Sequence, residues 1–103
     1  MGKSVFNKKT NNLFKAVLSL NTINEAQKFF RDLCTIEEIR DMSERFEIAK
    51  LIDSGMTYRG IAKRLKISTT TVSRVAGWLK NGMGGYKIVL NNLYHHKNLS
   101  GKR

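Results

Sequence analysis

Several features common in other proteins are missing or scarce in this chain, and each absence narrows its function. No proline occurs in the 103 residues, which fits a mainly helical fold. The only cysteine, Cys34, can form neither an intrachain disulfide nor a paired-cysteine metal site. No apolar run is long enough to span a bilayer, and no charged segment followed by an apolar one opens the chain like a signal peptide. We therefore expect a helical protein of the cytoplasm.

Negative charge is absent from the second half of the chain. All eight Asp and Glu residues lie between Glu25 and Asp53, whereas residues 54–103 contain ten Lys or Arg residues and carry a charge of +10. Residues 1–53 carry nine Lys or Arg residues and a net charge of +1. A basic field confined to one region favours a polyanionic partner. An acidic protein or a membrane surface could also bind this charge. A helix that lies on a membrane surface carries basic residues opposite a broad apolar stripe, and no helix predicted here has that pattern.

The basic half contains a pattern typical of a helix-turn-helix, predicted over residues 57–80. Thr57 is a suitable N-cap for a short helix, and Ser68 is a suitable N-cap for a second helix after a turn at Lys66 and Ile67. Apolar residues at helical spacing mark the two inner faces: Ile61, Ala62 and Leu65, then Val72, Val75, Ala76 and Leu79. The spacing alone also fits a helical hairpin in an ordinary bundle, but the one-sided charge favours a DNA-binding motif.

The outer face of this motif supplies residue types that bind duplex DNA. Hydroxyl side chains at a helix N-terminus can contact phosphates or base edges in the major groove, and a threonine methyl group can contact a thymine methyl group. The predicted DNA-binding residues are Thr57, Tyr58, Arg59, Lys63, Lys66, Ser68, Thr69, Thr70, Thr71, Ser73 and Arg74. Among them, Thr70, Thr71 and Ser73 are expected to influence base choice. Arg59 and Lys66 are expected to hold phosphates.

The rest of the chain is interpreted from the same kinds of pattern. Residues 1–11 are expected to form a mobile basic arm and residues 12–94 a single helical domain. Residues 12–53 are expected to form three helices, with T-x-x-E capping patterns at Thr22 and Thr35. Because the apolar surface of these helices is broad, we predict that they form a dimerisation core. A monomeric bundle is the alternative.

Beyond the predicted motif, a glycine-rich break precedes an expected C-terminal helix over residues 85–94 and a basic tail over residues 95–103. His95 and His96 are adjacent, so they point apart on a helix. Because no further Cys or carboxylate lies nearby in the sequence, we predict no metal site.

Residues 35–79 resemble the Trp-repressor-like superfamily, most closely its short Trp-repressor-related branch. With two residues before this range and three after it, the stretch that carries the resemblance reads LCTIEEIRDMSERFEIAKLIDSGMTYRGIAKRLKISTTTVSRVAGWLKNG. The resemblance implies an all-α fold, in which an intertwined helical homodimer presents one helix-turn-helix from each subunit to DNA. In such dimers the half-sites lie about one helical turn apart, ~34–36 Å.

The resemblance also implies where a small ligand would bind. Arg45 matches the arginine that holds the carboxylate of an amino acid, and Arg74 matches the arginine that stacks against an indole. Thr35 matches a threonine near the amino group of the ligand. Val75 and Trp78 occupy the positions where the repressor has a glycine and a serine. Their larger side chains would narrow or fill the space for the ligand. We therefore expect no cofactor and no response to tryptophan; a salt bridge of Arg45 within its own helix is the alternative role for that side chain.

Three functions are compatible with these observations. The residues favour a homodimeric transcription regulator, a repressor, that binds specific sequences of double-stranded DNA. The alternatives are the DNA-binding module of a transposase or recombinase and a nucleoid-associated protein without a regulated operon. Strand transfer usually needs clustered carboxylates for metal ions, and residues 54–103 contain none. We therefore predict no enzymatic activity and no catalytic residue.

Overall fold

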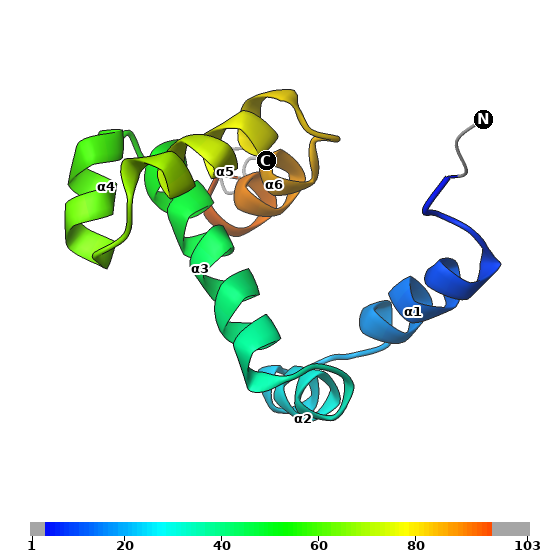
Figure 1. Cartoon of the computed structure of the whole chain (residues 1–103). Helices are drawn as coiled ribbons and strands as arrows, with labels where there is room; N and C mark the ends of the chain where they lie inside the picture. The colour runs from blue at the N-terminus through cyan, green and yellow to red at the C-terminus, as the bar shows by residue number, and fades with distance from the viewer. Residues whose placement is uncertain (1–3, 96–103) are drawn as a thin grey trace. The chain divides into compact units, whose positions relative to one another are not determined.

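The computed structural model describes residues 4–95, and every regular element in this range is helical (Figure 1). The all-α class predicted from the sequence is confirmed. The chain divides into two compact units, Met1–Ile39 (unit 1) and Arg40–Arg103 (unit 2), which are described separately. The helices are α1 (Lys8–Leu18), α2 (Ile23–Leu33), α3 (Ile36–Asp53), α4 (Tyr58–Leu65), α5 (Thr69–Asn81), α6 (Gly85–Leu90) and the π-helical η1 (Asn91–His95).

Helix α1 begins four residues earlier than the sequence pattern predicts. Asn7 is its N-cap: the side-chain oxygen accepts a hydrogen bond from the Thr10 N–H at 3.0 Å, and the Thr10 hydroxyl oxygen accepts one from the Asn7 N–H at 2.8 Å. This reciprocal pair satisfies two N–H groups that have no partner within the helix. The prediction of a mobile arm is therefore wrong for residues 8–11. Residues 1–3 of that arm lie outside the described range.

Helices α2 and α3 begin at the two predicted capping patterns. The Thr22 hydroxyl accepts a hydrogen bond from the Glu25 N–H at 3.1 Å, and the Glu25 carboxylate accepts one from the N–H of Asn21, not of Thr22. At α3 the exchange is reciprocal, because Thr35 and Glu38 each accept a hydrogen bond from the N–H of the other, at 3.1 and 2.9 Å. Local capping therefore determines where both helices start.

Helix α3 ends in a Schellman motif at Gly55. The Gly55 N–H donates to the carbonyl of Ile52 at 3.0 Å, and the Met56 N–H donates to the carbonyl of Leu51 at 3.1 Å. Gly55 has φ = 98°, a left-handed conformation that glycine adopts without steric cost. The motif ends α3 and turns the chain toward α4.

The core belongs to unit 2 and joins α3, α4, α5 and α6. Its buried residues are Ile48, Ala49, Leu51, Ile61, Ala62, Val72, Val75, Leu79 and Leu90. Ile67, in the turn between α4 and α5, packs against this cluster. Full burial of one branched aliphatic side chain contributes about 1.5–3 kcal/mol. The cluster therefore fixes α4 and α5 against the end of α3.

Unit 1 has no comparable core. None of its described residues, 4–39, is buried, although α1 and α2 both carry apolar side chains. Leu18 and Ile23 are 82% and 78% exposed, and the rings of Phe29 and Phe30 meet edge to face at 5.6 Å while staying half-buried. The apolar surface of unit 1 is therefore largely uncovered.

The C-terminal segment follows the predicted break. Gly84 has φ = 88° and precedes α6, which continues directly into the wider turn of η1. The segment predicted as one C-terminal helix, residues 85–94, is occupied by α6 and η1. His95, predicted to open a basic tail, belongs to η1, and its ring contacts Asp53 at the end of α3. The remainder of the predicted tail, residues 96–103, lies outside the described range.

Candidate nucleic-acid interface

Two capped helices, α4 and α5, form the part of unit 2 that the sequence assigns to DNA (Figure 1). The Thr57 hydroxyl accepts a hydrogen bond from the Gly60 N–H at 3.0 Å, which caps α4. The Ser68 hydroxyl accepts one from the Thr71 N–H at 3.1 Å, which caps α5. Both predicted N-caps are confirmed. Their bonds satisfy N–H groups that the helices themselves leave free.

The turn between the two helices has an unusual backbone. Lys66 adopts φ = 61° and ψ = 47°, a left-handed conformation that non-glycine residues rarely occupy. The N–H groups of Lys66 and Ile67 both donate to the carbonyl of Ala62, the latter at 3.0 Å. These bonds close α4 within one residue, and α5 can begin immediately after Ser68.

The outer face of α5 exposes short polar side chains. Thr69, Thr70, Ser73 and Arg74 are exposed. Thr71 is half-buried, and its hydroxyl lies 3.1 Å from the Ser68 hydroxyl. The Thr71 side chain thus takes part in the cap, whereas the other four side chains lie exposed on the surface of α5.

Exposed cations lie on α4 and in the turn that precedes α5. Arg59, Lys63 and Arg64 on α4 and Lys66 in the turn are all exposed. Within residues 4–95 none of the four forms an ion pair, since the ion pairs there are Lys50–Glu47 and His95–Asp53. Their positive charge is therefore not neutralised by a neighbouring carboxylate in that range.

Tyr58 has a different environment from the other predicted DNA-binding residues. It is half-buried and packs against the core cluster. Lys80 Nζ, near the end of α5, lies 5.8 Å from the centre of the Tyr58 ring. A cation over an aromatic face is attracted to it. This contact links the start of α4 to the end of α5 and places the Tyr58 ring mainly in a structural role.

The predicted ligand residues are only partly brought together. Arg45 and Arg74 line one small hollow of about 190 Å³ between α3 and α5. Thr35 belongs to unit 1. Val75 is 1% exposed and Trp78 is 49% exposed, and both side chains line this hollow. Within residues 4–95, Arg45 forms no ion pair with a carboxylate of α3.

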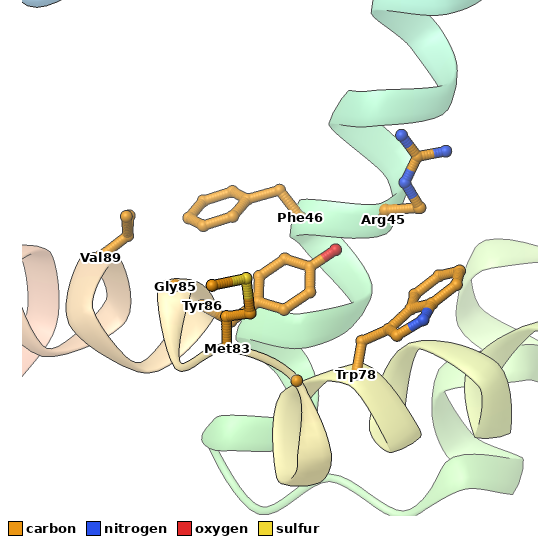
Figure 2. Close-up of a pocket in the computed structure, with 8 residues that line it drawn as sticks. Arg45, Phe46, Trp78, Met83, Gly85, Tyr86 and Val89 are labelled. Carbon is orange, nitrogen blue, oxygen red and sulfur yellow. The ribbon is translucent and has the colours of Figure 1, made fainter. Parts of the chain in front are cut away.

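A larger apolar hollow, of about 790 Å³, was not predicted from the sequence. Figure 2 shows Arg45 and Phe46 projecting from α3, Trp78 from α5 and Tyr86 from α6 around it. Met83 lies in the glycine-rich break beside them and is 85% exposed. The available signal was the clustering of large side chains on both sides of this break, but only the fold places Phe46 next to them.

Residues 4–95 contain neither a metal-binding cluster nor a membrane-spanning helix. Within residues 4–95, no group of three or more His, Cys, Asp or Glu side chains could hold a metal ion. No helix in that range is long and apolar enough to cross a bilayer.

The family model for the Trp repressor protein matches residues 8–94. The chain belongs to the Trp repressor family. The resemblance seen in residues 35–79 is thereby confirmed and extends over most of the chain.

Relatives within the Trp repressor family agree with this assignment. The chain is 38% identical over 86 residues to the uncharacterised protein YerC of Bacillus subtilis (strain 168), which covers 84% of this chain and 83% of YerC. A TrpR-like protein from Eubacterium eligens has 43% sequence identity and a TM-score of 0.80, over 86% of this chain and 92% of that one. A candidate Trp repressor from Staphylococcus aureus has 37% identity and a TM-score of 0.80, over 86% and 89%.

Proposed function

We propose that this Trp-repressor-family protein is a transcription regulator that binds specific sequences of double-stranded DNA. The α4–α5 pair acts as a helix-turn-helix and presents α5 to the major groove. The observation that carries the proposal is the exposed hydroxyl face of α5 together with four exposed cations, on α4 and in the turn before α5, that have no ion-pair partner within residues 4–95. The matching family description, a repressor protein, supports repression as the mode of regulation.

The residues of the proposed motif divide into two roles. Thr69, Thr70 and Ser73 lie at the N-terminal end of α5, the part of a recognition helix that contacts base edges. Arg59 and Lys63 lie on α4 and would neutralise phosphates, which fixes the orientation of the protein on the duplex without reading sequence. The free N–H groups and the positive dipole end at the start of α5 add to phosphate binding.

We infer further that the protein acts as a homodimer. Unit 1 leaves its apolar side chains uncovered, and unit 2 contains an apolar hollow lined by Phe46, Trp78 and Tyr86. Obligate interfaces are large and hydrophobic, roughly 2,000 Å² or more, and a second copy would supply such a surface. A two-fold dimer would also present two copies of α5 to half-sites about one helical turn apart, ~34–36 Å.

Tryptophan is not expected to switch this regulator. Val75 is buried at the place where the ligand-responsive repressor has a small residue, so the space beside Arg45 and Arg74 is reduced. The short turn at Lys66 and the apolar packing of Ile67 already fix α5 on the core. We therefore propose that the protein binds its operator without a small-molecule corepressor.

A salt titration with matched variants tests the proposed interface. Affinity for a fixed duplex should fall as salt rises, with a log–log slope of about −0.9 for each phosphate contacted. Lys63→Gln should make the slope shallower by about 1, because it removes one phosphate contact. Lys28→Gln on α2 removes the same charge outside the proposed motif and should leave the slope unchanged. Equal changes in both variants, or no binding to any duplex, would contradict the proposal.

A further inference from the structure

Gly77 lies in the interior of α5, where glycine is an unfavourable residue. Helix α5 runs from Thr69 to Asn81, so Gly77 has helical neighbours on both sides. In the interior of a helix, glycine loses more backbone freedom than alanine and contributes no side-chain packing. Its backbone is not left-handed, since the glycines with positive φ in residues 4–95 are Gly55 and Gly84. The conformation of α5 therefore does not require a glycine here.

Packing within the chain does not require a glycine at position 77 either. Among the described residues, a Cβ atom added at Gly77 would have no heavy atom within 4 Å beyond its sequence neighbours and the nearby backbone of its own helix. Gly60 on α4 differs, because the same atom there would lie 3.0 Å from the Thr57 hydroxyl oxygen. The space next to Gly77 is therefore open to a partner molecule.

The position of Gly77 along α5 places it on the proposed DNA-binding face. Residues three, four or seven positions apart lie on the same side of an α-helix. Gly77 follows Arg74, Ser73 and Thr70 by these intervals, and all three are exposed, while Gly77 itself is half-buried. The opposite side of the helix is buried through Val72, Val75, Ala76 and Leu79. Gly77 therefore shares the outer face of α5 with side chains proposed to contact DNA.

Two exposed cations flank Gly77 on this face. Arg74 lies three residues before Gly77 and Lys80 three residues after it, about 60° to either side around the helix axis. Neither cation forms an ion pair within residues 4–95. Lys80 Nζ lies 5.8 Å from the centre of the Tyr58 ring at the start of α4. A glycine between two such cations fits an anionic chain that crosses the helix at close range.

We propose that one strand of the bound duplex crosses α5 at Gly77, with its sugar–phosphate backbone against the glycine and its phosphates held by Arg74 and Lys80. The inference rests on the proposed DNA binding by α4 and α5. Without a Cβ atom, the helix backbone can approach a ligand more closely. Phosphate contacts fix the orientation of a helix on the duplex. Gly77 is therefore a positioning residue for base recognition by the N-terminal end of α5.

The first test adds side chains of increasing size at Gly77. Gly77→Ala should raise the melting temperature by about 4–8 °C, because alanine is the better helix former and its Cβ atom meets no neighbour. The same variant should weaken binding to one fixed duplex by about five- to tenfold, as expected when a group is forced into a close contact. Gly77→Leu should weaken it further. Asn11→Ala on α1 also favours helix formation at an exposed position and should leave DNA affinity unchanged.

The second test asks whether the effect at Gly77 depends on the flanking cations. Arg74→Gln/Lys80→Gln should make the log–log salt slope shallower by about 2, since two phosphate contacts are removed. In this background, Gly77→Ala should weaken binding by a smaller factor than in the unmodified protein, because the strand is no longer held against the helix. Arg74→Lys/Lys80→Arg preserves the charge and should keep both the slope and the full effect of Gly77→Ala.

Four results would overturn the inference while leaving DNA binding by α4 and α5 intact. The first is unchanged DNA affinity in Gly77→Ala and Gly77→Leu while Lys63→Gln still alters the salt slope. The second is an equal loss from Gly77→Ala in both backgrounds. The third is a lower melting temperature for Gly77→Ala, which would assign the glycine to packing. The fourth is dissociation of a dimer by Gly77→Leu in sedimentation equilibrium, which would assign this face to a second copy of the chain.

A different result would remove the basis of the inference as well. If the unmodified protein bound no duplex at any salt concentration, both the proposed function and the crossing of a DNA strand at Gly77 would be wrong.

Discussion

The Ser68 hydroxyl oxygen lies 3.1 Å from the backbone nitrogen of Thr71 and 3.1 Å from the Thr71 hydroxyl. These two contacts close the first turn of α5 and hold the side chain of Thr71 half-buried against it. The residues between and beyond them, Thr70 and Ser73, are left exposed on the outer face. The Ser68 cap therefore stabilises α5, and it also holds Thr71 while Thr70 and Ser73 remain exposed.

Loss of this cap should be measurable as a loss of stability. Ser68→Ala removes the acceptor for the Thr71 N–H, and we expect the free energy of unfolding to fall by about 1 kcal/mol. Ser68→Asp keeps an acceptor and should behave like the unmodified protein. Thr69→Ala, an exposed neighbour without a capping bond, is the matched control. Urea denaturation of the three variants checks the prediction, and an unchanged midpoint for Ser68→Ala would contradict it.

Lys66 should respond to substitution in opposite directions for stability and for DNA binding. Its left-handed backbone, φ = 61°, is unfavourable for a residue with a Cβ atom. Lys66→Gly should therefore raise the free energy of unfolding by about 0.5–1 kcal/mol, even after the entropic cost of glycine. The same change removes a proposed phosphate contact and should weaken binding to every duplex.

Lys66→Arg separates these two effects, since it keeps both the charge and the strained backbone. It should leave stability and DNA affinity close to those of the unmodified protein. Destabilisation by Lys66→Gly in thermal melts would show that the side-chain packing of Lys66 outweighs the strain of its backbone.

The local features of this fold were predictable from sequence, because each depends on residues a few positions apart. The caps at Thr57 and Ser68 and the helix end at Gly55 follow from short patterns with a known backbone requirement. The early start of α1 was missed because its capping box pairs Asn7 with Thr10 instead of the commoner Ser or Thr with Glu.

The long-range features could not be predicted, because no local pattern encodes them. The Asp53–His95 contact joins residues 42 positions apart, and the Tyr58–Lys80 contact depends on how α4 packs against α5. The same holds for Trp78, whose half-exposed position depends on the packing of α3, α5 and α6 around it. In the candidate site, the residue types could be read from the sequence. The sequence did not show that Thr71 is half-buried while Thr70 and Ser73 are exposed.

Proposed dimerisation should depend on the apolar surface of unit 1. Phe30→Asp places a charge in the half-buried aromatic pair with Phe29 and should abolish the dimer. Lys28→Asp introduces the same side chain at an exposed position of α2 and should leave the dimer intact. Sedimentation equilibrium at micromolar concentration measures the change. A monomeric unmodified protein under these conditions would refute the proposed dimer.

Free tryptophan should neither bind this protein nor alter its DNA affinity. The buried side chain of Val75 takes up space beside Arg45 and Arg74 that a flat aromatic ligand would need. Calorimetric titration should therefore show no stoichiometric heat. A tenfold gain in DNA affinity with tryptophan, about 1.4 kcal/mol of coupling, would contradict the expectation. Trp78→Ser restores a small residue, and a tryptophan response in this variant would identify the indole side chain as the block.

Substitutions on α5 should affect base recognition, and substitutions on α4 should affect phosphate binding. Thr70→Ala should change the order in which duplex variants are preferred, because an exposed side chain of the recognition helix contacts base edges. Arg59→Gln should weaken all of the duplexes by a similar factor, since phosphate contacts carry no sequence information. Competition binding across a panel of single-base variants distinguishes the two patterns. The reverse assignment would mean that α5 docks in a different orientation.

Sequence preference at fixed salt is the most direct measurement of the proposed function. Duplexes selected by the protein from a random pool should share a two-fold symmetric sequence. Their affinity should exceed that for bulk DNA by about 10³-fold or more, the range typical of specific DNA-binding proteins. Thr70→Ala should reduce this ratio while the salt dependence persists. A ratio near one for every selected duplex would contradict sequence-specific regulation and identify a protein that binds DNA through charge alone.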